Sequence, residues 1–548
     1  MSSEIGILVN TSSASQILQG ALALHRMGNL RAAMDGYMRV LKDDPQNADA
    51  LYYVAVVAVQ EGQYPDGIKL AQRALSVGPA QPRLHNLLGQ TYVRLGQEQD
   101  ALASFDRAIE LQPDFADAHG NRANVLVNLR RFDDALAAYD RALELRPDSY
   151  EDWVNRGALL QDFDLYEEAL TSYERAIALR PEVPAAHHNL ANILRDLSQI
   201  EDARASRKGT PPETGSFDLA IAAYDKAIAL DGKFFDAYLG RALVHLLRGN
   251  WDAGFRDFEY RSKVGKPTYV PLPQKLWKGE PLPGERLVLV AEQGLGDTIN
   301  FARFGTLLAA RGYDVTILVR PSMRALLSTI KGVTIATSPE ELAKDPRPLR
   351  WLPLMSVAGQ LGILPATIPA VVPYLTASPE RIATWAQRLG KDGFKIGINW
   401  ASGHSENLHF LKRNIPLADF APLAALPGIK LFSLQKGPAV QQIAEVAFRD
   451  RITTLDADPN PNDDLFLDTA AVMTQLDLII TCDTSVAHLA GALARPVFTA
   501  LPMIADWRWL LSRNDTPWYP TMRMFRQSAP RDWTDTMARI TEAVRAMM

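Results

Sequence analysis

The first half of the chain repeats one pattern of small, apolar and helix-breaking residues every 34 positions. Glycine ends a first helix at a tight turn, alanine lets two helices approach closely, and proline stops the second helix. The pattern predicts about seven antiparallel helix pairs over residues 14–262, after an N-terminal segment of residues 1–13. The landmarks are Gly28, Gly62 and Gly96, then Ala74, Ala108, Ala142 and Ala176, then Pro45, Pro79, Pro113, Pro147 and Pro181.

One insertion, residues 204–220, interrupts this spacing before the pattern resumes with Ala227 and Gly249. Its segment RASRKGTPPETG is rich in glycine, proline and polar residues. This composition favours a surface loop, with a docking loop as the alternative.

The second half alternates short β-branched runs with helical patterns, which argues for parallel strands joined by crossovers. A linker rich in proline and glycine, residues 263–284, precedes it. A proline-rich stretch then separates two sets of strands, so we predict two Rossmann-like halves, residues 285–376 and residues 377–548, the latter with a C-terminal helix. The expected strands are residues 287–290, 315–319, 333–336, 396–400, 431–434, 452–455, 478–481 and 497–501.

Composition and charge narrow the classes of function. The 548 residues include 58 Lys and Arg against 63 Asp and Glu, and a net charge of −5 disfavours nucleic acid and anionic membranes as partners. The single cysteine, Cys482, excludes an internal disulfide and a cysteine cluster. The nine histidines form no metal-binding motif, so no metal is expected. Since neither an export signal nor an unbroken apolar span is found, we expect a soluble cytoplasmic protein without a membrane span.

Two strand-ending loops carry the candidates for chemistry. Ligands of doubly wound sheets bind beyond the carboxyl ends of the strands, where both loops fall. Glycines in the first loop allow backbone to approach a ligand closely. The first loop holds Glu292, Gln293, Gly294, Gly296 and Asp297, and the second holds Asp483, Thr484, Ser485 and His488.

The second loop suits a phosphate or pyrophosphate, because a helix start presents unpaired N–H groups and a partial positive charge beside Thr484 and Ser485. The helix end contributes only about 0.3–2 kcal/mol, so further donors are expected, with Lys412 and Arg413 as candidates. A solvated basic pair is the alternative for these two. Trp400, at the carboxyl end of a strand, is expected to line the cleft.

Each of these candidates also has a structural interpretation. Asp297 and Asp483 both precede a helix, where aspartate is a favoured cap. His488 could instead be a satisfied core histidine. The aromatic residues near the C terminus are assigned to the core rather than to a sugar platform. They are Trp507, Trp509, Trp518 and Tyr519.

The helical repeats, with segments such as AYDRALELRPDSYEDWVNRGALLQ, resemble the tetratricopeptide repeat. Asn121, Asn155 and Asn189 are 34 residues apart on the first helix of successive units, the helix that lines the concave side of such arrays. Their amides can pair with the backbone of an extended acceptor peptide. Protein O-linked N-acetylglucosamine transferases, which the chain resembles in overall plan, use such a ladder. The alternative is that these amides only bond neighbouring repeats.

The second half carries AEQGLGDTINFARF, IGINWASG, TCDTSVAHLAGAL and PVFTALPMIADWRWLLSRNDTPWYP. Over about residues 285–527 it resembles bacterial glycosyltransferases of the heptosyltransferase-like kind, in the branch fused to tetratricopeptide repeats. The resemblance implies an α/β GT-B domain after an all-α repeat superhelix, with Asp297 as the base. It also implies that Asp483, Thr484, Ser485 and His488 contact the nucleotide sugar. Ser485 replaces the glycine usual in that family.

These observations predict an inverting, metal-independent glycosyltransferase that needs no cofactor. It would move a sugar from a nucleotide-sugar co-substrate to a hydroxyl of a protein recruited by the repeats. Similar bacterial fusions include flagellin glycosyltransferases, which makes flagellin a candidate acceptor. Should Asp297 not be the base, Glu292 is next in line. The rival hypotheses are a non-catalytic repeat scaffold with a degenerate glycosyltransferase-like domain, and a nucleotide-sugar epimerase or hydrolase of similar fold.

Overall fold

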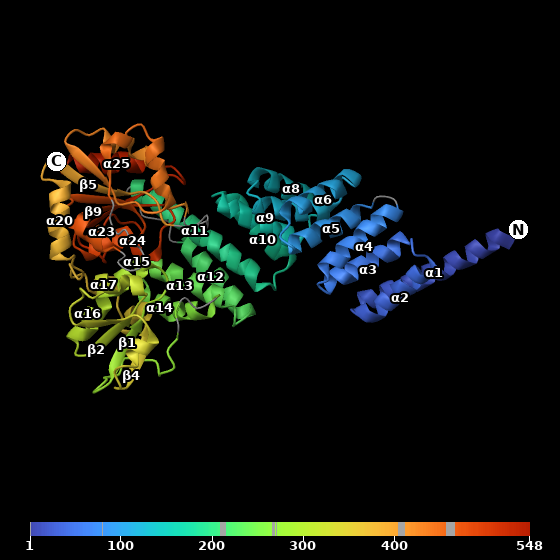
Figure 1. The fold of residues 1–548 in the computed structure, drawn as a ribbon, viewed down its shortest axis with the longest axis horizontal. Coiled ribbons are helices and arrows are strands. Elements are labelled where there is room, and N and C mark those ends of the chain that lie inside the picture. The colour runs from blue at the N-terminus through green and yellow to red at the C-terminus, as the bar shows by residue number, and fades with distance from the viewer. Residues whose placement is uncertain are drawn as a thin grey trace. The chain divides into compact units, whose positions relative to one another are not determined.

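The computed structural model describes residues 2–78, 81–208, 215–265, 269, 271–403, 411–455 and 466–548, with no side chains described for residues 2–13, 208 and 215. The chain divides into two compact units, Met1–Pro181 and Glu182–Met548. Figure 1 shows helices alone in the first unit, and helices together with strands in the second. The last repeats therefore belong to the same compact unit as the strands, and the division lies upstream of the predicted linker at residues 263–284.

The first unit consists of helix pairs, as the repeat pattern predicts. Gly28, Gly62 and Gly96 follow the first helix of their pairs with φ of +78°, +80° and +70°, a conformation that glycine adopts without strain. The alanine landmarks of the second helices, such as Ala108 and Ala142, are fully buried. The helices are α1 (Ser2–Arg26), α2 (Leu30–Asp43), α3 (Ala48–Gln60), α4 (Tyr64–Val77), α5 (Pro82–Arg94), α6 (Glu98–Leu111), α7 (Ala116–Asn128), α8 (Phe132–Leu145), α9 (Tyr150–Asp162) and α10 (Tyr166–Leu179).

The second unit begins with the remaining repeat helices, α11 (Pro184–Lys208), α12 (Gly215–Leu230), α13 (Phe235–Leu247) and α14 (Trp251–Phe258). The predicted surface loop at residues 204–220 is wrong at both ends, because residues 204–208 continue α11 and residues 215–220 begin α12. Residues 209–214 lie outside the described residues. The extended end of α11 contacts the second sheet region, since Arg207 pairs with Asp535 at 2.9 Å.

The first sheet has four parallel strands in the order β3-β2-β1-β4. They are β1 (Arg286–Val290), β2 (Asp314–Leu318), β3 (Val333–Ala336) and β4 (Leu349–Pro353). Sequence analysis predicted the first three but missed β4, whose sequence LRWLP lacks β-branched residues and ends in proline. The predicted linker before β1 is part of this fold, because Trp277 is buried and its N–H donates to the Trp351 carbonyl at 2.9 Å.

The second sheet has six parallel strands in the order β10-β9-β8-β5-β6-β7. Counted along the chain, this is the doubly wound order 3-2-1-4-5-6, with the switch point between β5 and β8. Only β10 was not predicted, because MRMFR alternates Met and Arg without a β-branched residue. The strands are β5 (Phe394–Asn399), β6 (Ile429–Ser433), β7 (Ile452–Thr454), β8 (Leu478–Cys482), β9 (Val497–Leu501) and β10 (Met522–Arg526).

Helices and short turns connect these strands, and the predicted C-terminal helix is α25. The α-helices are α15 (Leu295–Phe301), α16 (Arg303–Ala310), α17 (Arg324–Leu327), α18 (Pro339–Leu342), α19 (Val357–Gln360), α20 (Pro379–Leu389), α22 (Ala421–Ala424), α23 (Leu467–Thr474), α24 (Ser485–Ala492) and α25 (Thr534–Arg545). The 3-10 helices are η1 (Glu259–Lys263), η2 (Pro321–Met323), η3 (Leu354–Ser356), η4 (Pro365–Thr367), η5 (Leu417–Phe420), η6 (Pro438–Glu445), η7 (Arg449–Arg451) and η8 (Trp507–Trp509).

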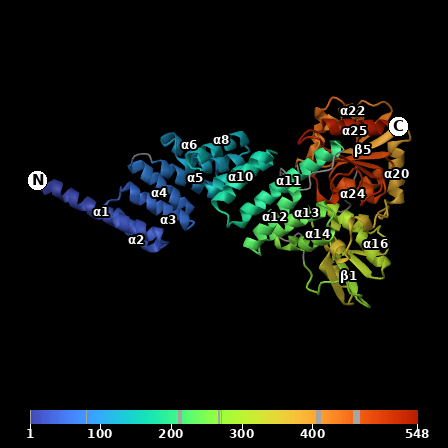
Figure 2. The same ribbon diagram turned by 180° about the vertical axis from the view of Figure 1, so that it is seen from behind.

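One hydrophobic core joins the last repeat to both sheets. Trp251 of α14 is fully buried, stacks on Trp518 at 5.5 Å and meets Trp507 edge-on at 5.7 Å between ring centroids. Phe255 and Phe258 bury into the same cluster. Figure 2, from behind, shows α13 and α14 lying against this region. The assignment of Trp507 and Trp518 to the core is confirmed, as are those of Trp509 and Tyr519.

We expect Trp251→Ala to destabilise the second unit by about 3–5 kcal/mol, because it leaves a cavity among packed aromatic rings. Denaturant unfolding with probes in each unit measures the effect. Trp153→Ala is the matched control, since Trp153 lies partly exposed in α9 of the first unit and donates only to the Pro147 carbonyl. An unchanged transition of the second unit in Trp251→Ala would show that the last repeat folds independently of the strands.

Candidate functional site

The two predicted loops meet at one cavity of about 700 Å³. The first loop follows β1 and the second follows β8, so each lies at the carboxyl end of its sheet. A third segment, Ser402 and Gly403, follows β5, which places the cavity beside the β5–β8 switch point. The lining residues are Gln293, Gly294, Leu295, Gly296, Asp297, Ser402, Gly403, Arg413, Asp483, Thr484, Ser485, His488, Asp506 and Arg508.

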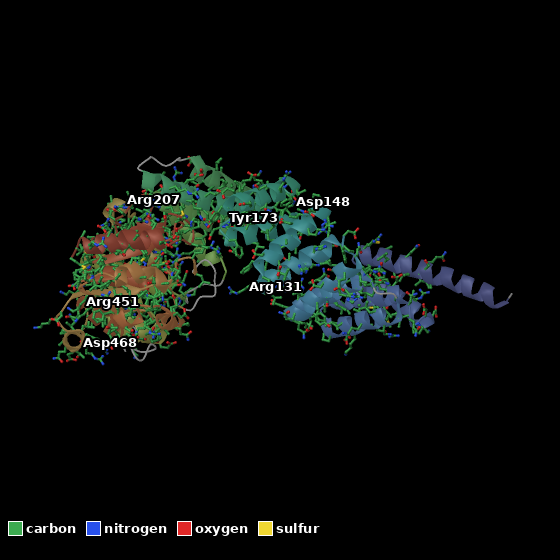
Figure 3. All side chains as sticks on the ribbon, turned by 90° about the horizontal axis from the view of Figure 1, so that it is seen from above. Arg131, Asp148, Tyr173, Arg207, Arg451 and Asp468 are labelled. Carbon is green, nitrogen blue, oxygen red and sulfur yellow. The ribbon has the colours of Figure 1, made fainter. Side chains whose placement is uncertain are left out.

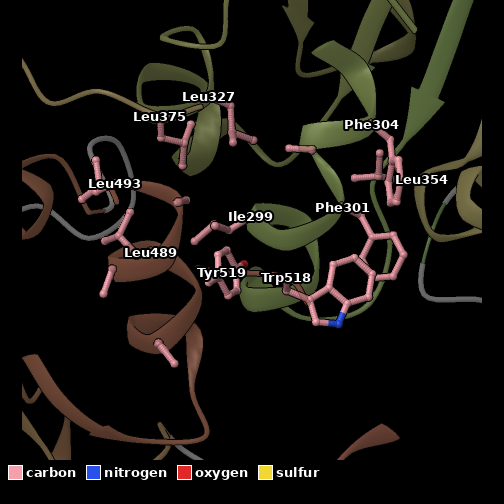
Figure 4. Close-up of a cluster of buried hydrophobic side chains, with 14 of the residues drawn as sticks. Ile299, Phe301, Phe304, Leu327, Leu354, Leu375, Leu489, Leu493, Trp518 and Tyr519 are labelled. Atoms are coloured by element: carbon pink, nitrogen blue, oxygen red, sulfur yellow. The ribbon is translucent and has the colours of Figure 1, made fainter. Parts of the chain in front are cut away.

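Close packing of α15 against α24 brings the two loops together. A Cβ on Gly296 would come within 2.9 Å of the His488 ring and 3.4 Å of the Ser485 Cα. Glycine is therefore required at this position by close approach of the helices. Figure 4 shows Ile299 of α15 facing Leu489 of α24, with the Tyr519 ring beside them. All three side chains belong to the core that joins the sheets.

Asp297 both caps its helix and forms an ion pair across the cavity. Its Oδ2 accepts the N–H of Gly294 at 2.9 Å, which satisfies the start of α15. Its Oδ1 accepts from Nη2 of Arg508, 211 residues further along the chain. Asp297 therefore makes a capping contact, but from inside the helix as the third residue of α15, whereas the sequence placed it before the helix; the N-cap residue is Gly294. The Asp297 side chain remains about 20% exposed, so it also faces the cavity.

Arg508 and Asp506 line the cavity, and sequence analysis missed both. Asp506 immediately precedes the turn η8 after β9 and Arg508 lies within it, and Nη1 of Arg508 donates to Oδ1 of Asp506 at 2.7 Å. Burial would lower the pKa of Arg508, but Asp297 and Asp506 raise it above its ordinary value. A signal was available, because the loop after the predicted strand at residues 497–501 lies at the same sheet edge as Asp483.

Asp483 does not cap α24; it is buried and pairs with Arg413 at 3.3 Å. Burial raises the pKa of Asp483, against the charge of Arg413 and with that of Asp506. The pKa of Asp506 is lowered, because Arg508 and Arg413 outweigh the effect of its burial. Opposite shifts are expected of two carboxylates that share one site.

Thr484 and Ser485 start α24 at the cavity wall. The Thr484 hydroxyl donates to Oδ1 of Asn399 at 2.9 Å, and the Thr481 hydroxyl donates to the same oxygen at 3.0 Å. Asn399, at the end of β5, in turn donates to Gln435 at 2.8 Å. This buried network fixes the second loop at the cavity wall, where α24 begins. Neither Asn399 nor Gln435 was predicted.

His488 lines the cavity while it is almost completely buried. Its ring stacks on Trp509 with centroids 5.3 Å apart, and Nδ1 lies 3.1 Å from the Tyr519 hydroxyl. Burial lowers the pKa of His488 to about 3, with Arg508 acting in the same direction and Asp297 against it. The imidazole is therefore neutral near pH 7. His488 is therefore both a buried core residue and a residue of the cavity lining, the two alternatives that the sequence left open.

Three predicted residues are placed elsewhere. Trp400 does not line the cavity, because its side chain is fully buried in the second sheet's own core. Lys412 lies partly exposed and is not among the lining residues, whereas Arg413 is. Glu292, the alternative base, is buried and pairs with Arg261 of η1 at 2.7 Å, and it also accepts the Met355 N–H at 3.1 Å. Of the first loop, Gln293, Gly294 and Gly296 do line the cavity.

The asparagines of the repeats make hydrogen bonds between repeats in the first unit. Nδ2 of Asn121 donates to Asn86 at 3.0 Å, and Nδ2 of Asn155 donates to Asn124 at 3.1 Å. Each bond joins neighbouring helix pairs, as the alternative to peptide binding expects. Asn189 lies partly exposed on α11 in the second unit.

Although three carboxylates line the cavity, no three His, Cys, Asp or Glu side chains within the described ranges are grouped to hold a metal ion. Among the helices that the structure describes, none has the length and apolar character needed to cross a bilayer.

Models of the tetratricopeptide repeat match residues 24–91, 86–150, 166–203 and 213–268. Tetratricopeptide repeats run through the N-terminal part of the chain. The protein FlbA of Caulobacter vibrioides is 26% identical over 359 residues, covering 61% of this chain and 59% of FlbA. The chain thus spans about three-fifths of the length of this curated relative.

Two solved structures show likeness over about a third of the chain or somewhat more. PilF of Pseudomonas aeruginosa is 16% identical, with 42% of this chain and 96% of PilF covered and a TM-score of 0.36. YrrB, described as a repeat protein with an unusual peptide-binding site, is 26% identical, with 32% of this chain and 92% of YrrB covered and a TM-score of 0.27.

The lowered pKa of His488 predicts a loss of stability in acid. Between the ordinary pKa of 6.5 and about 3, the unfolded chain binds a proton at this residue and the folded chain does not. Folding stability therefore falls as pH drops through this window, by up to about 1.4 kcal/mol per pH unit. We expect His488→Gln to flatten the pH dependence of denaturant unfolding of the second unit.

His119→Gln, in α7 of the first unit, is the matched control and should leave that dependence as in the parent chain. Equal slopes in the parent chain and His488→Gln would mean that the imidazole is not held neutral by its surroundings.

Proposed function

We propose that the chain is a glycosyltransferase that moves a sugar from a nucleotide-sugar donor to a hydroxyl of a protein recruited by the repeats, as in protein O-glycosylation. The observation that carries this proposal is the convergence of two strand-ending loops, one from each parallel sheet, on a single cavity of about 700 Å³. Such a volume lies within the range of about 300–1,000 Å³ usual for small-molecule sites. Two facing parallel sheets are also the arrangement of the GT-B fold.

Donor binding is assigned to the second sheet's side of the cavity. The first N–H groups of α24 and the hydroxyl of Ser485 suit the diphosphate of a nucleotide sugar. Arg413 and Arg508 supply positive charge, although both already contact aspartates.

Proton transfer is assigned to Asp297 on the opposite wall. A transferase needs a base for the acceptor hydroxyl and a clamp for the charge that develops on the departing phosphate. Asp297 faces the cavity and is held in orientation by Gly294 and Arg508. In the proposed reaction the leaving diphosphate competes with Asp297 for hydrogen bonds from Arg508. That competition weakens the hold of Arg508 on the Asp297 carboxylate when a base is required.

The acceptor is assigned to the tetratricopeptide repeats, because arrays of this kind present extended surfaces for binding. Flagellin is the proposed acceptor on the family resemblance. Intact-mass measurement of flagellin co-expressed with the chain tests this assignment. An added sugar supports it, and an unmodified flagellin in cells where another protein gains the sugar reassigns the acceptor.

Donor consumption tests the reaction itself. The full chain is incubated with a panel of nucleotide sugars, and released nucleotide is followed with and without cell extract. Release that depends on extract supports transfer, whereas equal release without extract indicates a hydrolase. Absence of both binding and release across the panel favours the scaffold.

We expect Asp297→Asn to lower kcat for transfer by about 10²–10⁴-fold, because the amide keeps an acceptor oxygen for Gly294 but cannot take a proton. Nucleotide binding, measured by calorimetry, should change only a few-fold. Asp314→Asn is the matched control, since Asp314 begins β2 at the amino edge of the same sheet and pairs with the exposed Arg347. Full kcat in Asp297→Asn would assign the proton to another group.

A further inference from the structure

A second cavity of about 260 Å³ is lined by four arginines. It lies where the end of α11 meets β10 and α25, all within the second unit. Arg207 comes from α11, Arg513 from the loop after η8, Arg526 from the end of β10, and Arg539 from α25. Figure 3 shows Arg207 at the end of its helix, beside the region that contains the strands. None of these residues lines the larger cavity.

The positive charge of this arginine cavity is only partly compensated. Arg207 and Arg539 share one carboxylate, Asp535, at 2.9 and 3.0 Å, and Arg513 pairs with Asp515 at 2.7 Å. Arg526 forms no ion pair with a carboxylate of the described residues; Asp202 and Asp483 act on it only at longer range. Four guanidinium groups thus share two directly paired carboxylates.

Two buried polar atoms of the cavity lining have no hydrogen-bond partner in the described structure. They are Nε of Arg526 and Nε2 of Gln527, and Gln527 is only 4% exposed. A buried donor without an acceptor costs about 1–3 kcal/mol, so such atoms point to a bound partner. Burial also lowers the pKa of Arg526 to about 10. This lowering is expected when nearby carboxylates do not fully balance the charge of the guanidinium. Both orphan atoms are N–H donors, which select an acceptor-rich ligand.

We propose that the arginine cavity binds a small anion that carries a phosphate group. Guanidinium groups match phosphate oxygens in geometry and charge, and the amide of Gln527 adds a neutral donor. The volume is below the range of about 300–1,000 Å³ usual for larger ligands, so a phosphate or a small phosphate ester fits, and a whole nucleotide sugar does not. The site is separate from the larger cavity and does not depend on transferase activity.

The anion site has a direct connection to the loop that carries Arg508. Nη2 of Arg526 donates to the carbonyl of Trp509 at 3.0 Å and to that of Leu510. On the other side of the loop, Ser512 donates its N–H to Asp202 of α11 at 2.9 Å. An anion held by Arg526 therefore orders the segment that positions Arg508 at the larger cavity.

Isothermal titration of the full chain with inorganic phosphate, at constant ionic strength, tests the proposal. We expect saturable binding that falls at least tenfold in the double variant Arg207→Gln/Arg513→Gln, whose side chains are partly exposed. Arg107→Gln, an exposed arginine of α6 paired with Glu110, is the matched control and should bind as the parent chain does. Glucose 1-phosphate, titrated in parallel, distinguishes a phosphate ester from free phosphate as the better ligand.

Arg413→Gln separates the two cavities, because it removes a cation from the larger one only. Phosphate binding that is lost in Arg413→Gln and kept in the double variant would overturn the proposal, as would absence of binding to the parent chain. If the double variant does not fold, Gln527→Met replaces it, since this change keeps the side-chain volume and removes the unpartnered amide. Unchanged phosphate affinity in Gln527→Met would then also overturn the proposal.

Discussion

The buried guanidinium of Arg508 is the interaction on which the geometry of the larger cavity depends. It bonds Asp297, from the loop after β1 of one sheet, and Asp506, from the loop after β9 of the other. Removing one member of a buried ion pair commonly costs 3–5 kcal/mol, because a charge is left without a partner. The two sheets are thus held at a fixed separation by charge as well as by the core around α15 and α24.

The same ion pair limits the chemistry that the cavity can perform. Arg508 cannot clamp a phosphate at full strength while it holds two carboxylates, and Asp297 cannot act as a free base while Arg508 holds it. In the proposed reaction the donor diphosphate removes both constraints, because it accepts hydrogen bonds from Arg508 in place of part of the bonding to Asp297. The neutral state of His488 fits this arrangement. A protonated His488 would add a positive charge beside Arg508 and would weaken the ion pair between Arg508 and Asp297.

Local patterns predicted the elements whose formation depends on local chemistry. Glycine and proline landmarks located the helix pairs, and β-branched runs located eight of the ten strands found among the described residues, so both strand-ending loops could be assigned to a sheet edge. Long-range packing decided the rest. Nothing local to NWDAGFRDF shows that Trp251 stacks on Trp518, so the packing of the last repeat against the strands could not be predicted. Arg508 and Asp506 were missed because they were considered only as part of an aromatic segment. Both residues follow β9, which lies next to β8 in the sheet.

The shared core connects the last repeat with residues that support the larger cavity. Arg261, just after α14, pairs with Glu292 at the end of β1, and the next residue, Gln293, lines the cavity. Trp251 also packs against Trp507 of η8, the neighbour of Arg508. The last repeat and the turn after it therefore contact residues adjacent to cavity-lining residues on both sides: Glu292 is next to Gln293, and Trp507 is next to Arg508. The residues of the predicted linker that the structure describes from 271 onward pack against the first sheet instead of forming a tether, so the last repeat and the cavity are connected through packed side chains and a buried ion pair.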